Sequence, residues 1–235
     1  MMMLTAGCRK PAENTGTGAV HIQFIHKAGN RGFSLNTNYT NNPAEQFAVT
    51  KFKYYISGIE LNGVKAATET YFLVDENDPA SKNIAVSFKT GLYHSLSFLL
   101  GVDSLHNVSG AQTGALDPLN GMFWTWNSGY IMAKMEGVSP ASTLPGNIFE
   151  YHIGGFSGAN NVLKKITLTF PGNLSYQLKK DKELTIAVNA DILEWFKSPS
   201  DLSIATTPSC TTPGALARKV ADNYADMFSI LSVNE

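Results

Sequence analysis

The sequence predicts a mostly β protein: one antiparallel, sandwich-like domain with a helix near its C-terminus. The first observation is composition, because 13 Phe and 9 Tyr occur with 20 Gly, a mixture typical of pleated strands joined by turns. The second is a repeated alternation of apolar and polar residues over short segments. The third is size, since 235 residues of which 43% are hydrophobic suffice for one large core.

The first predicted strands show this alternation clearly. In 20–25 the apolar side chains of Val20, Ile22 and Phe24 share one face, and 52–59 repeats the pattern. Asn62-Gly63 then supplies a turn, and we expect 71–74 to return as the hairpin partner of 52–59. Further strands are predicted at 84–88, 96–100, 130–135, 149–153, 163–170 and 184–189.

Two helices are predicted in the last quarter of the chain. A short one follows Asp191, which has capping-box spacing to Glu194. The final one follows Thr212-Pro213 and carries an apolar stripe that should pack on the sandwich: Leu216, Val220, Tyr224, Met227, Phe228 and Leu231. The segment 103–121 is long, rich in Gly, Asn and Ser, and weakly periodic, so we expect a functional or mobile loop.

The N-terminal segment resembles the end of a lipoprotein signal peptide. Ala6 and Gly7 precede Cys8, so Cys8 is the expected lipidation site, with the true start of translation further upstream. Residues 1–19 are then a signal remnant and flexible tether, and 20–235 form the domain. A lipidated Cys8 leaves Cys210 without a disulfide partner, and the lipid would be the only membrane anchor of an exported protein.

Charge and motifs argue against several functions. The formal net charge of −1 provides no basic field for nucleic acid. The segment 155–159 does not match a nucleophile elbow, and 75–79 lacks the later ligands of a calcium loop. The chain also has no phosphate-binding or dinucleotide-binding fingerprint, so we do not expect an enzyme.

The five histidines are scattered, and none has zinc-like spacing to another. His26 continues the inward phase of the first strand, which leaves either a hydrogen-bonded core histidine or a metal ligand. His152 lies on the polar face of its strand, just before Gly154-Gly155, where a ligand can approach closely. His94 is expected in the core and His106 in solvent.

Two tryptophans distinguish the segment GMFWTWNSGY at 121–130. Trp124 and Trp126 face the same side if this segment is extended. Three interpretations remain open: a large core anchor, an aromatic platform for a ligand, and a redox-active tryptophan.

Five segments of the chain together resemble the MbnP-like copper-binding proteins, in the lipoprotein form typical of Bacteroidetes. They are GMFWTWNSGY at 121–130, GVDS at 101–104, GALDPLNG at 114–121, YHIGGFSG at 151–158 and KFKYYISGIEL at 51–61. The resemblance implies a methanobactin-associated protein of the periplasm or outer-membrane surface that binds copper. It also implies a di-haem cytochrome c peroxidase-like partner that oxidises a tryptophan to kynurenine. Carried over to this chain, Trp124 or Trp126 is the modified residue, and His26 and His152 are the copper ligands.

Two competing hypotheses stand beside copper binding. In the first, Trp124 and Trp126 form an exposed recognition face of a non-enzymatic cell-surface adhesion module. In the second, Asp103, Asp117 or Glu150 acts with a histidine as the acid and base of an enzyme. Copper binding predicts His26 and His152 together beside an indole, whereas adhesion predicts exposed indoles and separated histidines.

Overall fold

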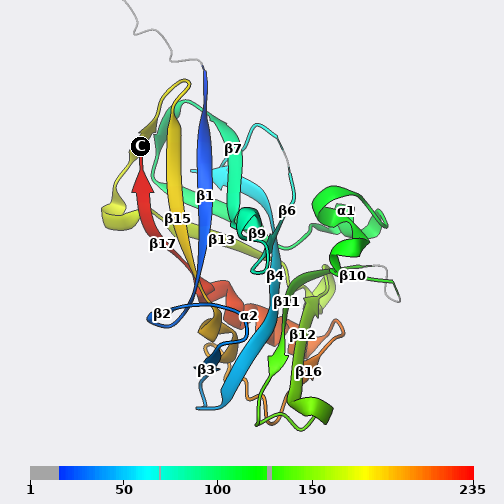
Figure 1. Cartoon of the computed structure of the whole chain (residues 1–235). Coiled ribbons are helices and arrows are strands. Elements are labelled where there is room, and N and C mark those ends of the chain that lie inside the picture. The colour runs from blue at the N-terminus through cyan, green and yellow to red at the C-terminus, as the bar shows by residue number, and fades with distance from the viewer. Residues whose placement is uncertain (1–15, 69, 126–128) are drawn as a thin grey trace, which may run out of the picture.

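The computed structural model describes residues 16–68, 70–125 and 129–235. Cys8 and Trp126 lie outside these residues. The described part is mostly β, as predicted, and most of its strands belong to two main sheets that pack against each other, with helix α2 near the lower end of the first sheet (Figure 1).

The first sheet contains β17, β15, β1 and β2 in this order, with β7 on the other side of β1. Its strands are β1 (Thr17–Ala28), β2 (Arg31–Gly32), β7 (Asn83–Lys89), β15 (Glu183–Asp191) and β17 (Phe228–Asn234). β1 alternates between buried and more exposed positions along its length, as the sequence pattern of 20–25 predicts. Its pairing with β15 is parallel, however, so the sheet is mixed rather than antiparallel throughout.

The second sheet is built around the long strand β4. Its main path is β13-β9-β4-β11-β12-β16, and β3, β5 and β6 also pair with β4, while β10 pairs with β11. The bounds are β3 (Asn38–Thr40), β4 (Gln46–Leu61), β5 (Val64–Lys65), β6 (Phe72–Asp75), β9 (Ser95–Leu100), β10 (Phe123–Trp124), β11 (Gly129–Val138), β12 (Ile148–Gly154), β13 (Lys164–Thr169) and β16 (Ser209–Cys210). Asn62-Gly63 forms the predicted turn, although it leads first to β5, and 72–75 returns beside β4 afterwards.

A small third sheet pairs β8 (Gly91–Tyr93) with β14 (Tyr176–Leu178). Short 3₁₀ helices occupy many of the connections: η1 (Pro79–Lys82), η2 (Gly114–Leu116), η3 (Pro118–Asn120), η4 (Pro145–Asn147), η5 (Gly158–Asn160), η6 (Pro171–Asn173), η7 (Ile192–Phe196) and η8 (Ala225–Met227). The predicted short helix after Asp191 is η7, and the Asp191 carboxylate accepts a hydrogen bond from the Leu193 amide at its start. The predicted long loop 103–121 contains helix α1 (Ser104–Val108), η2 and η3.

The predicted C-terminal helix is α2 (Ala215–Tyr224), and it is shorter than its apolar stripe suggested. Phe228 and Leu231 belong instead to β17, which pairs antiparallel with β15. The helical stripe ends at η8, and in β17 Phe228 is buried whereas Leu231 is 41% exposed, so the spacing between these two residues did not reflect one buried face.

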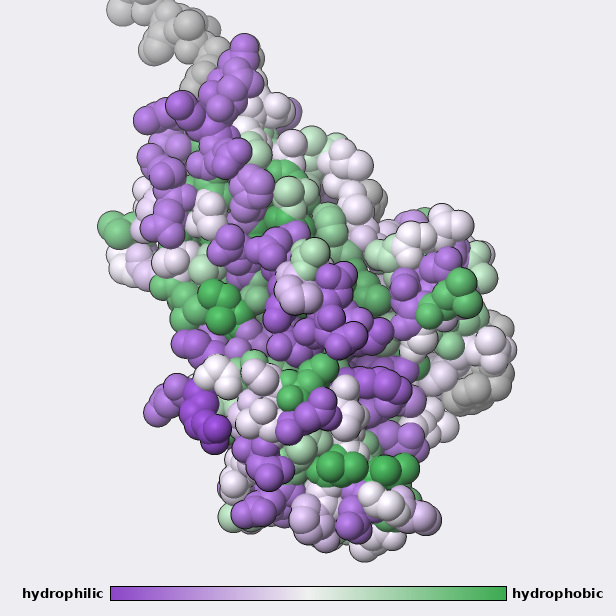
Figure 2. Space-filling model, in the orientation of Figure 1, coloured by the Kyte–Doolittle hydropathy of each residue, from purple (hydrophilic) through white to green (hydrophobic). Residues whose placement is uncertain are grey.

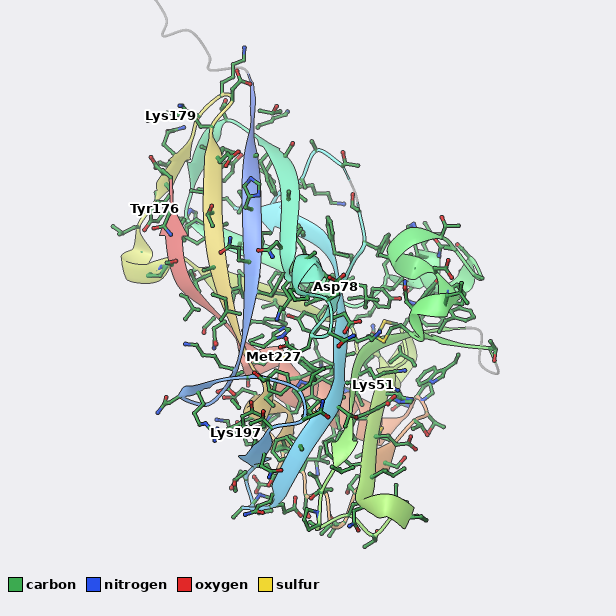
Figure 3. The ribbon with its side chains drawn as sticks, in the orientation of Figure 1. Lys51, Asp78, Tyr176, Lys179, Lys197 and Met227 are labelled. Atoms are coloured by element: carbon green, nitrogen blue, oxygen red, sulfur yellow. The ribbon has the colours of Figure 1, made fainter. Side chains whose placement is uncertain are left out.

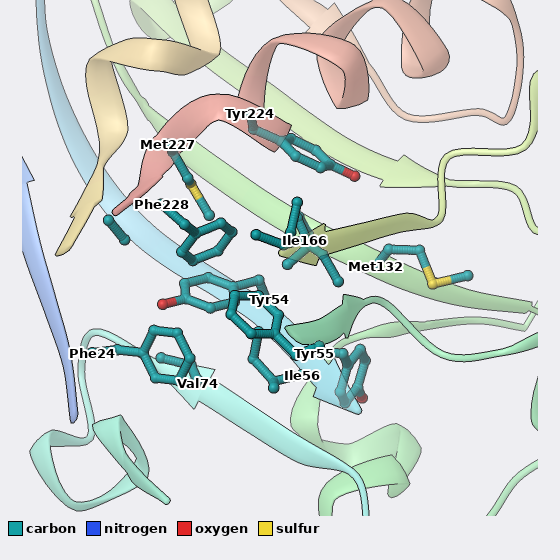
Figure 4. Packing of buried hydrophobic residues seen from close by; sticks show 14 of the residues in the cluster. Phe24, Tyr54, Tyr55, Ile56, Val74, Met132, Ile166, Tyr224, Met227 and Phe228 are labelled. Atoms are coloured by element: carbon teal, nitrogen blue, oxygen red, sulfur yellow. The ribbon is translucent and has the colours of Figure 1, made fainter. Parts of the chain in front are cut away.

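The two main sheets enclose an aromatic core. The ring of Phe24 on β1 makes edge contacts with Tyr54 on β4, Phe98 on β9 and Phe228 on β17, at centroid distances of 5.9, 5.9 and 6.0 Å. Figure 4 shows Tyr54, Phe228 and Met227 packed together in this layer. Each such side chain contributes about 1.5–3 kcal/mol by leaving water. The face of the molecule seen in Figure 2 is largely hydrophilic, with hydrophobic residues scattered over it.

Candidate functional site

His26 points into the core, as its phase predicts, and only 5% of the residue is exposed. Its Nδ1 lies 2.6 Å from Oε2 of Glu76 and its Nε2 lies 2.8 Å from the Tyr54 hydroxyl oxygen. Burial lowers the pKa of His26, against the opposing effect of Glu76, so the ring is neutral. A carboxylate only accepts hydrogen bonds, so Nδ1 donates to Glu76 and Nε2 accepts from Tyr54. Both ring nitrogens are therefore hydrogen-bonded to side chains, which agrees with a hydrogen-bonded core histidine.

His152 lies on the opposite face of the second sheet. His152 is paired with Lys134 of β11, and Lys134 is paired with Lys53 of β4. Tyr54 is the next residue of β4 after Lys53. Successive residues of a strand point to opposite faces, so the Tyr54 side chain points toward His26 and the His152 side chain points away from both. The structure does not bring His26 and His152 together, and they cannot both bind one ion in this arrangement.

The imidazole of His152 is held by Glu136 of β11. Nε2 lies 2.9 Å from Oε1 of this carboxylate, whose Oε2 also lies 2.8 Å from Nζ of Lys51. Lys51 is labelled in Figure 3, on β4. The hydrogen bond with His152, aided by Lys51 and Lys134, lowers the pKa of Glu136 to about 2. Because the carboxylate is ionised and only accepts, the proton of His152 lies on Nε2 and the lone pair on Nδ1.

Trp124 packs on the same face of β12 as His152. A Cβ atom built on Gly154 would lie 2.4 Å from Cζ3 and 2.6 Å from Cη2 of the Trp124 ring, so the indole rests directly on this glycine. Gly154 lies two residues beyond His152 on β12, which places both on one face about 6.6 Å apart. The indole therefore lies against the same face of β12 as His152, two residues further along the strand.

The indole of Trp124 is a packed side chain rather than an exposed one. Only 6% of the residue is exposed, so Trp124 offers no stacking face of the kind that the adhesion hypothesis requires. A pocket of about 270 Å³ lies beside it, lined in part by Tyr130, Gly155 and Phe156. The core-anchor interpretation of Trp124 thus agrees with its burial.

The remaining histidines and carboxylates differ from expectation in two places. His94 is exposed rather than buried, and His106 is hydrogen-bonded to Asp103 at 2.9 Å rather than simply solvated. Asp117 caps η3 by accepting from the Leu119 amide, and Glu150 lies 3.3 Å from the Ser209 hydroxyl. Among the described residues, no three His, Cys, Asp or Glu side chains cluster in a way that could hold a metal ion.

Sequence reasoning missed Glu136 and Lys134, which share the face of His152. Their alternation along β11 is visible in the sequence, but their proximity to His152 depends on the β11–β12 register. Cys210 is buried in β16, where loss of solvation raises the pKa of its thiol to about 11. No helix within the described ranges is both long and apolar enough to cross a membrane.

Comparison with known proteins gives one consistent result. The MbnP family model matches residues 17–212. Among solved structures, the chain is similar to MbnP from Methylosinus trichosporium, with a TM-score of 0.55 and 18% sequence identity over 93% of this chain and 98% of that chain. No curated protein sequence matches. The structural similarity shows a shared fold.

Proposed function

Because the chain belongs to the MbnP family, whose model matches residues 17–212, we propose that it binds copper and is not an enzyme. The proposed site lies on the outward face of β12, at His152 and Trp124. The observation that supports it is the placement of the Trp124 indole on Gly154, on the same face as the imidazole of His152.

His152 has the environment of a metal-binding histidine. Ligating histidines commonly donate their second ring N–H to a carboxylate, which fixes the tautomer and orients the ring. Glu136 accepts from Nε2 at 2.9 Å, which leaves the Nδ1 lone pair as the donor that copper favours. His26 does not fit this site, because both of its nitrogens are hydrogen-bonded on the opposite face of the sheet. The proposed site therefore omits His26.

The second ligand requires a change in a tryptophan. An indole N–H is only a donor and has no lone pair for a metal, so unmodified Trp124 does not complete a copper site. Oxidation to kynurenine would provide an aromatic amine, and we assign this oxidation to a di-haem cytochrome c peroxidase-like partner. Trp126 is the other candidate, and it lies outside the described residues. The chain itself then binds and orients copper and catalyses no step.

The location proposed for the protein follows from the sequence. Cys8 would carry lipid, and the residues between Cys8 and β1 would tether the domain to the periplasmic or outer surface of a bacterial membrane. The sequence-based tether of 1–19 is too long at its end, because residues 17–19 already belong to β1. An exported position agrees with a partner of the di-haem peroxidase class, which would need access to the edge of β12.

The test is copper analysis of protein isolated from its native host, with peptide mapping across residues 121–130. We expect near-stoichiometric copper and a mass change on one tryptophan. His152→Ala should lose one equivalent of copper, whereas His94→Ala, at an exposed histidine away from the site, should keep it. Full copper uptake by His152→Ala, or unmodified tryptophans with no copper even after reconstitution, would overturn the proposal.

A further inference from the structure

A second cluster of donor atoms lies away from β12, where Tyr71 meets helix α1. The Tyr71 hydroxyl oxygen is 2.6 Å from Nδ1 of His106, and this Nδ1 is 2.9 Å from Oδ2 of Asp103. The hydroxyl also contacts Oδ2 of Asp103 directly. Three donor atoms from three side chains thus form a closed triangle.

Two segments distant in sequence hold this triangle in place. Asp103 caps α1, accepting from the amides of Leu105 and His106 at 2.9 and 3.1 Å, which fixes its carboxylate. Asn107 is fully buried and accepts from the amide of Tyr130 on β11 at 2.9 Å, which fixes α1 on the sheet. Tyr71 immediately precedes β6, whose pairing with β4 begins at the next residue. The donors are therefore organised before any ligand arrives.

The three contacts among Tyr71, Asp103 and His106 outnumber the protons that these groups can place between them. The Tyr71 hydroxyl supplies one proton, and Nδ1 of His106 supplies at most one. The Asp103 carboxylate accepts hydrogen bonds from the amides of Leu105 and His106 and supplies no proton. Three short contacts are thus shared by at most two protons. A single cation would interact favourably with all three donor atoms.

The spacing and chemistry of the donors also suit a cation. Metal–ligand bonds of about 2.0–2.2 Å place neighbouring ligands about 2.8–3.6 Å apart in tetrahedral or octahedral geometry. Asp103 Oδ1 and Oδ2 lie 3.2 and 2.9 Å from Nδ1 of His106, within this range. The Tyr71 oxygen lies 2.6 Å from Nδ1 and closer still to Oδ2 of Asp103, so it has to move outward to reach ligand spacing. The side chains of His106 and Asp103 are 32% and 33% exposed, which leaves room for water as a further ligand.

We propose that Tyr71, Asp103 and His106 form a metal site for a first-row transition-metal dication, separate from the copper site proposed at His152. The ligands are Nδ1 of the imidazole and a carboxylate oxygen, which are usual zinc ligands, and the Tyr71 phenolate oxygen as a third anionic donor. Binding releases the Tyr71 hydroxyl proton to solvent, and the imidazole keeps its one proton on Nε2. One proton is therefore released for each ion bound.

The test is calorimetric titration of the full chain with Zn²⁺, in the His152→Ala background, in two buffers of different ionisation enthalpy. We expect one Zn²⁺ to bind with release of one proton. Tyr71→Phe removes only the phenol oxygen, so it should weaken binding by ~10-fold or more and abolish the proton release. His106→Ala should abolish binding. Asp103→Asn keeps a good helix cap but removes the charge, so it should also weaken binding.

His94→Ala is the matched control and should bind Zn²⁺ as the parent does. Circular dichroism of each variant verifies that the fold is kept. No Zn²⁺ binding by the parent, or binding and proton release that Tyr71→Phe and Asp103→Asn leave unchanged, would overturn the site. Because His152 is already absent in this background, failure here leaves the copper proposal standing, and loss of copper in His152→Ala alone leaves this site standing.

Discussion

The Trp124 indole of the proposed copper site rests on Gly154, two residues beyond His152 on β12. Gly154→Ala is therefore the most direct test of how this indole packs. The added methyl carbon would lie 2.4 Å from Cζ3 of Trp124 and 2.9 Å from the carbonyl oxygen of Tyr130. The carbonyl belongs to β11 and cannot withdraw without disturbing the strand. The indole has to move instead.

The cost follows from these distances. Ordinary contact begins near 3.4 Å, so the ring edge has to withdraw by about 1 Å. Only 6% of Trp124 is exposed, so neighbouring residues resist this movement. Overpacking of this kind costs roughly 1–3 kcal/mol. In a chain of this length, that lowers Tm by about 2–12 °C.

The assay is urea unfolding with acrylamide quenching of tryptophan emission, followed by copper titration of the partner-modified protein. Gly154→Ala should be less stable, more easily quenched and weaker in copper binding. Gly32→Ala is the control, because a Cβ there meets no atom within 4 Å. If Gly154→Ala unfolds within about 0.5 kcal/mol of the parent, as neutral surface changes do, the indole does not rest on this glycine.

Three further predictions concern residues beside and below the site. His26→Ala should lower the free energy of unfolding by roughly 2–5 kcal/mol in urea, because it leaves a cavity and removes the hydrogen-bond partner of the buried Tyr54 hydroxyl, while Glu76 keeps its ion pair with Lys82. The variant should keep copper, and loss of copper would make His26 a ligand. The pKa of Glu136 falls from 4.5 to about 2 on folding, so its contribution to stability is present above pH 4.5 and is lost as pH falls toward 2. Glu136→Gln should flatten unfolding curves measured across this window, and an unchanged pH dependence would contradict the assignment. Asn223→Ala leaves the carbonyls of Trp195 and Ser200 unpaired in the core and should cost roughly 2–4 kcal/mol by thermal or urea unfolding, whereas a change below about 0.5 kcal/mol would show that water replaces the amide.

Local patterns predicted most of the strands. Alternation of apolar and polar residues predicted β1, which buries one face along its length. It also predicted β4, although residues 54–57 of this strand are buried on both faces. The end of α2 was not predictable in this way, since Phe228 continues the helical stripe while belonging to a strand. The exposure of His94 was also missed, because it precedes β9 rather than continuing its inward phase.

The candidate site was predicted only in part. Sequence alone drew attention to Trp124 and His152, but the indole reaches the imidazole's face through the pairing of β11 with both β10 and β12. Such register is a property of distant segments, so neither the contact of Trp124 with Gly154 nor the hydrogen bond from His152 to Glu136 has a local signature. The inward phase of His26 was predicted correctly, yet its separation from His152 depends on which sheet each strand joins.

The parallel pairing of β1 with β15 has a consequence for how this protein folds. β1 lies between β7 and β15, so residue 19 sits beside residue 183 and the first sheet stays incomplete until the last quarter of the chain is present. Contacts between such distant residues close slowly. During that interval β1 exposes an unpaired edge with an apolar face, the kind of surface on which chains aggregate. The order of synthesis thus makes the first strand of this protein one of the last to be protected.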